Sequence, residues 1–208
     1  MFANKPIIGL VGGIGSGKSF IARMFGEEGC LVIDSDRAVG EAYKRPEVRE
    51  KLREWWGEAV FLPGPDGGIN RKAIAQRVFA DEKERKRLEG LIHPIVAEIR
   101  EEEMKRGAGD AWVRAYVWDT PLLLEAGLGG QCDAIVYVES TEEERLERVR
   151  RTRGWDEGEL RRREKLQMPL DKKRDMANDM VRNTAGADDE VRNQVRKVLS
   201  RILAGPVK

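Results

Sequence analysis

The sequence predicts an α/β fold in which a doubly wound parallel sheet carries a phosphate-binding loop after its first strand. Three observations predict it. Residues 7–11 form a short apolar run typical of a buried strand, and residues 20–25 follow with apolar positions at helical spacing. Between them, Gly12 to Ser19 read as a glycine, four residues and then Gly-Lys-Ser. Further strands alternate with helices along the chain, as in sheets whose parallel strands are joined by helical crossovers.

The glycine-rich stretch has the composition that a phosphate site requires. Glycines let backbone N–H groups converge on phosphate oxygens, and the helix that follows directs its positive end at the same oxygens. Lys18 would reach the β- and γ-phosphates of a nucleotide, and the Ser19 hydroxyl would ligate Mg²⁺. An ordinary glycine-rich turn is the alternative, but the strand before and the helix after favour a P-loop. We therefore predict nucleotide binding by Gly13, Ile14, Gly15, Ser16, Gly17, Lys18, Ser19 and Phe20.

Composition bounds the remaining possibilities. The chain of 208 residues suits one domain, or one domain with a substantial insertion. With 38 basic and 37 acidic residues, the net charge of +1 gives no case for nucleic-acid or membrane binding. Cys30 and Cys132 each open a predicted strand and are expected to be small buried side chains in a reducing compartment. Without a visible signal peptide or a membrane-length apolar run, we expect a soluble cytoplasmic protein, monomeric or weakly homo-oligomeric.

Carboxylates follow two predicted strands, at the edge where open α/β sheets bind ligands. One apolar run ends in Asp34 and Asp36, which would share one side of an extended strand, with Ser35 opposite. Either aspartate is alternatively a helix N-cap or a turn residue. A second strand, over residues 111–118, puts Asp119 at its carboxyl end, where an aspartate would meet Mg²⁺ through water.

Residues 37–106 change in character and predict a helical insertion. A helix with a stripe of apolar and tryptophan residues is followed by a Pro- and Gly-rich loop at 63–68 and by two more helical patterns. The apolar face is either a platform for a substrate or the core of a helical subdomain. His93 precedes Pro94, so it either bonds a substrate phosphate or base, or has a structural role at a helix break.

The last third of the chain predicts a strand at 132–138 and then a basic segment. Thr141 and Glu144 form a capping-box signature that opens a helix. Many arginines flank Gly154-Trp155, and a lid that closes over phosphates explains them better than a solvated, self-paired face. A short strand at 180–183 and an amphipathic helix follow. The predicted divisions are a core of 1–36, 107–140 and 178–208, an insertion of 37–106 and a lid of 145–170.

These features favour a small kinase with a P-loop NTPase, nucleoside-kinase-like fold. A GTPase should carry an Asn-Lys-x-Asp guanine reader, and the sequence has none. A helicase or transporter ATPase would need a longer chain with further motifs. An inserted helical domain together with a lid fits a kinase that phosphorylates a small acceptor.

The chain resembles the dephospho-CoA kinase family over nearly its whole length. The resemblance rests on the P-loop and on further separated motifs in a fixed order, which are Val32 to Asp36, Asn70-Arg71 with Val78-Phe79, Leu88 to Pro94, Pro121 to Glu125, Gln167 to Leu170, and Ala177 to Asn183. It implies ATP-dependent phosphorylation of the ribose 3′-hydroxyl of dephospho-CoA, with Mg²⁺, and an insertion that binds the CoA moiety.

The resemblance also implies roles for individual residues. Asp36 would be the general base, and Lys18 with a lid arginine would stabilise the transferring phosphoryl group. Counting back from Gln167, the lid arginine falls on Thr152, between Arg151 and Arg153; Gly154 favours Arg153 as the catalytic residue, with Arg151 as a nucleotide contact. Asn183 would belong to the adenine pocket. The implied substrate contacts are Asp36, His93, Pro121, Leu122 and Glu125, and the implied metal ligands are Ser19 and Asp119.

Two alternatives stay open at this point. The first is a kinase for another nucleotide or small alcohol on the same scaffold. The second is a non-catalytic regulator that binds nucleotide, although the presence of Lys18, Ser19 and Asp36 together favours an enzyme.

Overall fold

The chain forms two compact units. The computed structural model describes residues 1–64 and 67–205, so parts of the predicted 63–68 loop and the end of the predicted core lie outside the described residues. One unit combines Met1–Asp34 with Met104–Lys208, and the other is Ser35–Glu103. The functional divisions into core, insertion and lid stay predictions.

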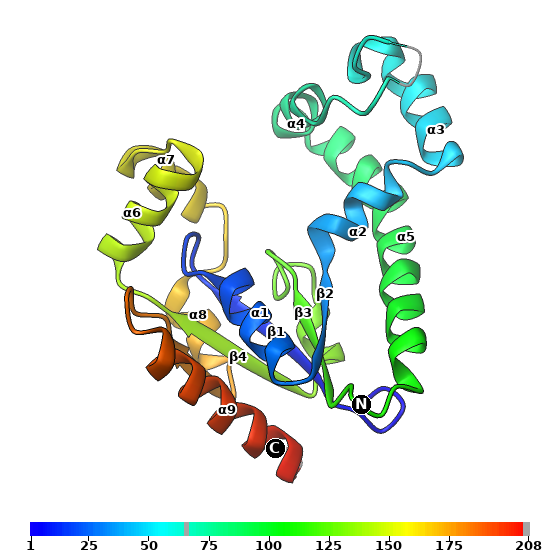
Figure 1. Ribbon diagram of the computed structural model, residues 1–208. Helices are drawn as coiled ribbons and strands as arrows, with labels where there is room; N and C mark the ends of the chain where they lie inside the picture. The colour runs from blue at the N-terminus through cyan, green and yellow to red at the C-terminus, as the bar shows by residue number, and fades with distance from the viewer. Residues whose placement is uncertain (65–66, 206–208) are drawn as a thin grey trace. The chain divides into compact units, whose positions relative to one another are not determined.

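The first unit is built on a parallel sheet (Figure 1). Its strands are β1 (Ile7–Gly12), β2 (Cys30–Asp34), β3 (Ala115–Asp119), β4 (Ala134–Glu139) and β5 (Asp179–Arg182). Their order is β2-β3-β1-β4-β5, with every neighbouring pair parallel. Because β3 and β4 lie on opposite sides of β1, the chain winds both ways from the centre, and the predicted doubly wound fold is confirmed.

Both faces of the sheet are buried, which explains why its strands are near-continuous apolar runs. On one face, Ile8 and Leu10 of β1 belong to a core shared with α1 (Lys18–Glu27) and α9 (Asp188–Ala204). On the other face, Ile7 and Val11 belong to a core with Tyr116 and Trp118 of β3. Because successive side chains of β1 enter the two cores in turn, the strand is held between them. The loop that follows β1 is therefore anchored at the end of a buried strand.

The segment between β4 and β5 contains three helices. They are α6 (Glu142–Arg153), α7 (Glu157–Glu164) and α8 (Leu170–Asp175), and a short 3₁₀ turn, η2 (Leu128–Gln131), precedes β4. The capping box predicted for α6 is confirmed, because the Thr141 hydroxyl accepts from the Glu144 amide while the Glu144 carboxylate accepts from the Thr141 amide.

The second unit is helical, as predicted. It contains α2 (Ser35–Ala42), α3 (Pro46–Trp56), η1 (Gly57–Val60), α4 (Arg71–Ala80) and most of α5 (Glu82–Ala108). The apolar stripe of α3, formed by Val48, Leu52 and Trp56, is buried in the core of this unit together with Ile74 and Ile92. These side chains therefore serve as a subdomain core, the second of the two roles considered for the apolar face.

Several predicted boundaries are wrong. Ser35 and Asp36 are not extended, because β2 ends at Asp34 and α2 begins at once. Helix α5 continues through Pro94, so no helix break occurs at His93; proline fits helical φ, and packing of flanking residues into the core offsets the lost hydrogen bond. Strand β3 starts at Ala115 rather than at residue 111. Cys132 ends the 3₁₀ turn before β4 rather than opening the strand.

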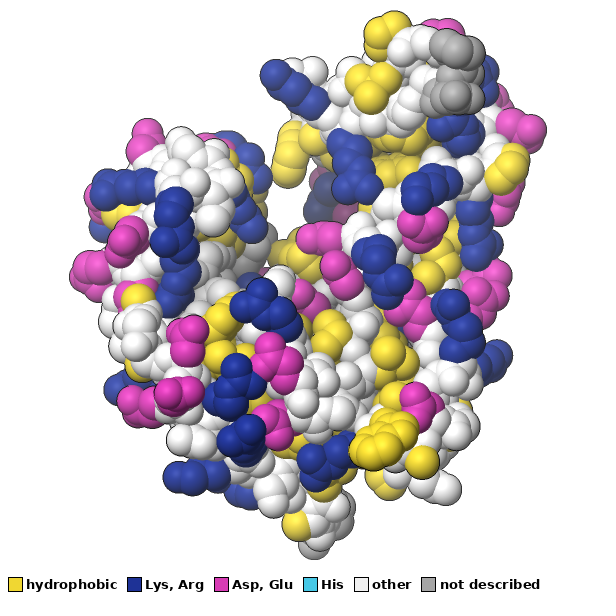
Figure 2. Space-filling view, viewed as in Figure 1, with side chains coloured by type: hydrophobic (Ala, Val, Ile, Leu, Met, Phe, Trp, Pro, Cys, Tyr) yellow, Lys and Arg dark blue, Asp and Glu magenta, His cyan; other side chains and the backbone are white. Residues whose placement is uncertain are grey.

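Surface charge follows the balanced composition. On the face seen in Figure 2, acidic and basic side chains are interspersed rather than gathered into a patch of one sign. Neither cysteine takes part in a disulfide within the described residues; Cys30 is buried and burial raises its pKa to about 12, while Cys132 is partly buried. Among residues 1–64 and 67–205, no helix has the length and apolar character needed to cross a membrane.

Candidate active site at the P-loop

The loop between β1 and α1 needs glycine at two positions. Gly15 and Gly17 have φ of 77° and 88°, which L side chains rarely adopt. A Cβ at Gly15 would lie 2.7 Å from the carbonyl oxygen of Arg145 on α6, and a Cβ at Gly17 would overlap the amide nitrogen of Asn183. The glycines therefore permit both the turn and the close approach of two distant segments.

Other residues that the sequence predicts to bind nucleotide are Gly13, Ile14, Ser16 and Phe20. Gly13 and Ser16 are buried, and the Ser16 hydroxyl has no hydrogen-bond partner within the described part of the chain. Ile14 is partly buried, and Phe20 packs against the core beneath α1. The backbone of these residues can bind phosphate, whereas the Phe20 side chain serves packing.

Lys18 lies within the loop and is poorly solvated. Its ammonium group donates to the carbonyl oxygens of Gly12 and Gly13, at 3.3 and 3.2 Å. Burial above all, together with the positive charges of Lys173 and Arg153, lowers its pKa to about 8, although the negative charges of Asp119 and Glu125 act in the opposite direction. Lys18 thus remains mainly protonated at neutral pH, in an environment that an anionic ligand would improve. Asp119, Glu125 and Arg153, which the sequence predicts as site residues together with Lys18, thus all influence the Lys18 ammonium group electrostatically.

The predicted metal ligands line one hollow. Ser19, Asp34 and Asp119 are among the residues that bound a space of about 480 Å³ beside α1. Ser19 is exposed, Asp119 is the last residue of β3, and Asp34 pairs with Asp119 in the sheet register. Hydroxyl and carboxylate oxygens are hard donors of the kind that Mg²⁺ prefers, so the donor set fits this ion.

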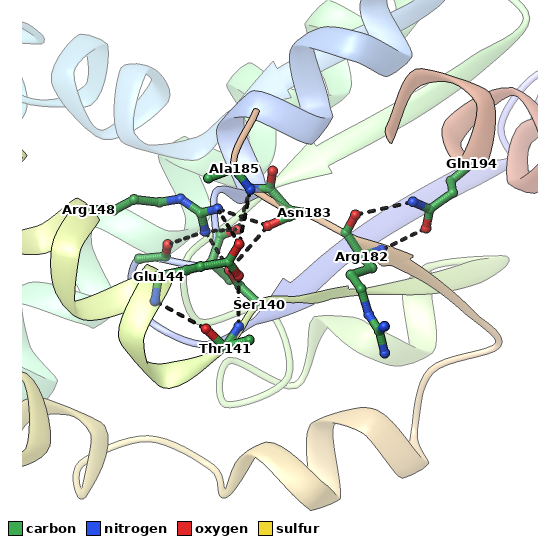
Figure 3. Close-up of polar contacts among 10 residues, drawn as sticks. Ser140, Thr141, Glu144, Arg148, Arg182, Asn183, Ala185 and Gln194 are labelled. Atoms are coloured by element: carbon green, nitrogen blue, oxygen red, sulfur yellow. Dashed lines mark hydrogen bonds and ion pairs between the residues drawn. The ribbon is translucent and has the colours of Figure 1, made fainter. Parts of the chain in front are cut away.

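Arg148 and Asn183, which lie next to each other in Figure 3, hydrogen-bond to the backbone of the P-loop. The Asn183 amide nitrogen donates to the carbonyl oxygen of Ser16 at 2.7 Å. The Arg148 guanidinium donates to the carbonyl oxygens of Gly15, Ser16 and Asn183, at 3.2, 3.3 and 2.8 Å, and to the Ser140 hydroxyl at 2.5 Å. Asn183 was predicted as an adenine contact; its amide nitrogen instead holds the protein's own loop here, and the adenine contact stays a prediction.

The basic segment contains arginines with different partners. Arg145 is buried and pairs with Glu164, while Arg161, Arg162 and Arg163 pair with glutamates, so self-pairing explains these four. Arg151 and Arg153 are exposed. The positive charge of Arg153 lowers the pKa of Lys18, and the role of Arg153 as a lid arginine stays a prediction.

A buried lysine near the loop was missed by sequence reasoning. Lys173 is 2% exposed, and its ammonium lies 2.8 Å from the Glu125 carboxylate and 3.1 Å from the Gln167 side-chain oxygen. Glu125 also accepts from the Met168 amide at 3.0 Å. Although partial burial opposes it, the hydrogen bond from Lys173 lowers the pKa of Glu125. Glu125 therefore holds Lys173, whose positive charge lowers the pKa of Lys18. Nothing in the local sequence distinguishes this lysine from its basic neighbours.

The other predicted substrate contacts are placed separately. Pro121 and Leu122 are exposed immediately after β3, whereas the following leucines are buried beneath the sheet. Asp36 and His93 belong to the helical unit, where Asp36 lies in the first turn of α2 and His93 is exposed on α5. Direct contacts of these four residues with a substrate stay predictions.

Comparison with known proteins identifies the family to which this chain is similar. The family model described as dephospho-CoA kinase matches residues 6–189. A protein of that name from Corynebacterium efficiens is 36% identical over 198 residues, covering 94% of this chain and 96% of that protein. Another, from Syntrophotalea carbinolica, is 35% identical over 201 residues, covering 96% and 93%.

Solved structures agree with the fold. A Thermus thermophilus protein superposes with a TM-score of 0.83 at 33% identity, covering 97% of this chain and 99% of that one. A dephospho-CoA kinase from Campylobacter jejuni (TM-score 0.69, 21% identity, 97% and 98% covered) and a shikimate kinase from Acinetobacter baumannii (0.52, 19%, 99% and 97%) share the fold. With a family match across nearly its whole length, the chain belongs to the dephospho-CoA kinase family.

Proposed function

We propose that this protein transfers the γ-phosphoryl group of ATP to the ribose 3′-hydroxyl of dephospho-CoA, giving CoA and ADP. The observation that carries the proposal is the family match over residues 6–189; a P-loop containing Lys18 and Ser19, and the position of Asp119 on the same hollow as Ser19, support it. A cytoplasmic location, with the chain acting as a monomer or weak homo-oligomer, is part of the same proposal.

The reaction exchanges one P–O bond for another and transfers one proton. The 3′-oxygen of the ribose bonds to the γ-phosphorus as the bond to the β–γ bridging oxygen breaks, and the hydroxyl proton goes to Asp36. Lys18 and Arg153 stabilise the negative charge of the transferring group, and the influence of the Arg153 charge on Lys18 supports this joint role. Arg151 and the P-loop amides hold the nucleotide, and Pro121, Leu122, Glu125 and His93 are proposed on the acceptor side.

Ser19 and Asp119 would hold Mg²⁺, which neutralises charge on the β- and γ-phosphates when bound. Ser19 is exposed on the first turn of α1, and Asp119 is the last residue of β3. Because Asp119 also interacts with Lys18, the carboxylate balances the ammonium beside the phosphates.

The proposal is tested by measuring ADP formation with purified protein, ATP and Mg²⁺ across a panel of acceptors. The panel includes dephospho-CoA, adenosine, a nucleoside monophosphate and shikimate. We expect turnover with dephospho-CoA in clear preference to the others, with the phosphate on the 3′-oxygen by mass spectrometry and ³¹P NMR. Preference for another acceptor would retain the kinase and reject the substrate, and absence of turnover with every acceptor would favour a nucleotide-binding regulator.

Arg148→Lys is expected to raise the KM for ATP about tenfold or more. A lysine keeps the charge but cannot donate at once to Gly15, Ser140 and Asn183, so the amides of the P-loop lose their fixed direction. Steady-state kinetics at saturating dephospho-CoA measures the effect. Arg150→Lys, an exposed position on the same helix, is the matched control and should leave KM unchanged. An unaltered KM in Arg148→Lys would show that the hydrogen bonds from Arg148 to the P-loop are not needed for ATP binding.

A further inference from the structure

The turn between α6 and α7 places an aromatic ring next to the proposed lid arginine. Helix α6 ends at Gly154, whose φ of 66° reverses the chain. The Gly154 amide donates to the carbonyl oxygen of Arg150, and the Trp155 amide donates to that of Val149. The first bond is the helix-terminating bond of a left-handed glycine, and the second folds Trp155 back toward the last turns of α6.

The indole of Trp155 lies against two guanidinium groups. The Cζ atom of Arg153 is 4.8 Å from the ring centroid, and that of Arg163 is 4.1 Å away. Both distances are within the range of cation–π attraction, which is strongest for tryptophan. The Arg163 guanidinium also donates to the Glu159 carboxylate at 2.6 Å, so an acidic side chain neutralises it.

Arg153 differs from Arg163 in its electrostatic surroundings. Among the residues of 1–64 and 67–205, no carboxylate forms an ion pair with Arg153, and its aromatic contact is with Trp155. Its charge acts on Lys18 in the P-loop. An arginine held by a ring rather than by a carboxylate keeps its donors and its full charge for a phosphate.

We infer that Trp155 is a positioning residue, whose indole ring holds the Arg153 guanidinium in place for the phosphates of the bound nucleotide. This inference rests on the proposed function, because it takes Arg153 to be the lid arginine. A flexible arginine side chain loses rotamer freedom when it binds a phosphate, and a ring that orders it beforehand reduces that loss. Trp155 therefore acts on the phosphoryl group through Arg153 and touches neither substrate.

The test compares kcat for Trp155→Leu and Trp155→Phe with that of the unaltered protein. Leucine keeps an apolar side chain but has no π-face, so kcat should fall about 3- to 10-fold with the KM for dephospho-CoA unchanged. Phenylalanine retains a ring and should restore part of the loss. Trp112→Leu is the matched control, since Trp112 is 86% exposed and has no arginine stacked on it in the described structure. If Trp155→Leu does not fold, Trp155→Met supplies the same comparison.

Repeating the substitution of Trp155 in an Arg153→Ala variant separates a positioning role of Trp155 from a merely structural one. In Arg153→Ala, the further change Trp155→Leu should alter kcat less than twofold, because the group that the ring holds is gone. An equal loss in both backgrounds would overturn the inference. If Arg153→Ala lowers kcat but Trp155→Leu does not, the inference alone fails. If Arg153→Ala leaves kcat unchanged, the role proposed for Arg153 fails, and the inference fails with it.

Discussion

Asp36→Asn is expected to lower kcat by about two orders of magnitude or more while ATP binding stays close to that of the unaltered protein. Asparagine has nearly the same shape as aspartate but cannot accept the proton of the ribose hydroxyl at neutral pH. The change therefore removes the base without removing a group that holds the nucleotide. Single-turnover kinetics with dephospho-CoA and calorimetric titration with ATP measure the two effects independently.

Glu41→Gln supplies the matched control for this prediction. It makes the same carboxylate-to-amide change on the same helix, at a side chain that pairs with Lys44 on the surface. We expect this variant to keep full activity. If Asp36→Asn also retains activity, the proton acceptor is another group, and the neighbouring Asp34 at the end of β2 becomes the next candidate.

The position of Asp36 in the chain supports its assignment despite the error in its predicted conformation. It follows Asp34 by two residues, so its Cα lies within about 7 Å of the Asp34 Cα. Asp34 in turn pairs in register with Asp119 and lines the same hollow as Ser19. The extended conformation was predicted because an apolar run gives no sign of where a strand ends. In the structure, Asp36 lies in the first turn of α2 instead, where a carboxylate interacts favourably with the helix dipole.

Features that depend on local sequence were predicted well. The glycine pattern identified the loop between β1 and α1, and the Thr141–Glu144 pair identified the start of α6. Each of these signals acts within a few residues, through backbone φ or an end-of-helix hydrogen bond. Local preference gave a wrong prediction where it competes with packing. At Pro94 it predicts a helix break, but α5 continues because residues on both sides of Pro94 pack into the core.

Features that depend on distant partners could not be predicted. Arg148 and Lys173 occur in segments with many basic residues, and the sequence pattern treats all of them alike. What distinguishes Arg148 is bonding to carbonyl groups more than 100 residues earlier, in the P-loop. What distinguishes Lys173 is burial against Glu125. Both roles depend on contacts between segments that lie far apart in the sequence, and no single segment encodes such contacts.

Lys18→Ala is expected to lower kcat by about 100-fold or more and to weaken ATP binding. The ammonium group donates to the carbonyl oxygens of Gly12 and Gly13 within the P-loop, so we expect it to lie close to phosphates that the loop amides bind. Alanine leaves the transferring group without its nearest cation. Kinetics and calorimetric titration with ATP provide the measurements, and Lys197→Ala, an exposed lysine on α9, serves as the control with unchanged values.

The same variant is expected to keep or raise the thermal stability of the protein without nucleotide. The pKa of Lys18 is about 8 in the folded chain against 10.5 ordinarily, so the folded state binds this proton more weakly than the unfolded state does. At neutral pH the charged lysine therefore opposes folding, and its removal relieves that cost, as expected for a residue retained for function. A melting temperature several degrees lower in Lys18→Ala, measured without nucleotide, would mean that the bonds to Gly12 and Gly13 hold the loop together. The loss of activity would then reflect a disordered loop rather than a missing charge.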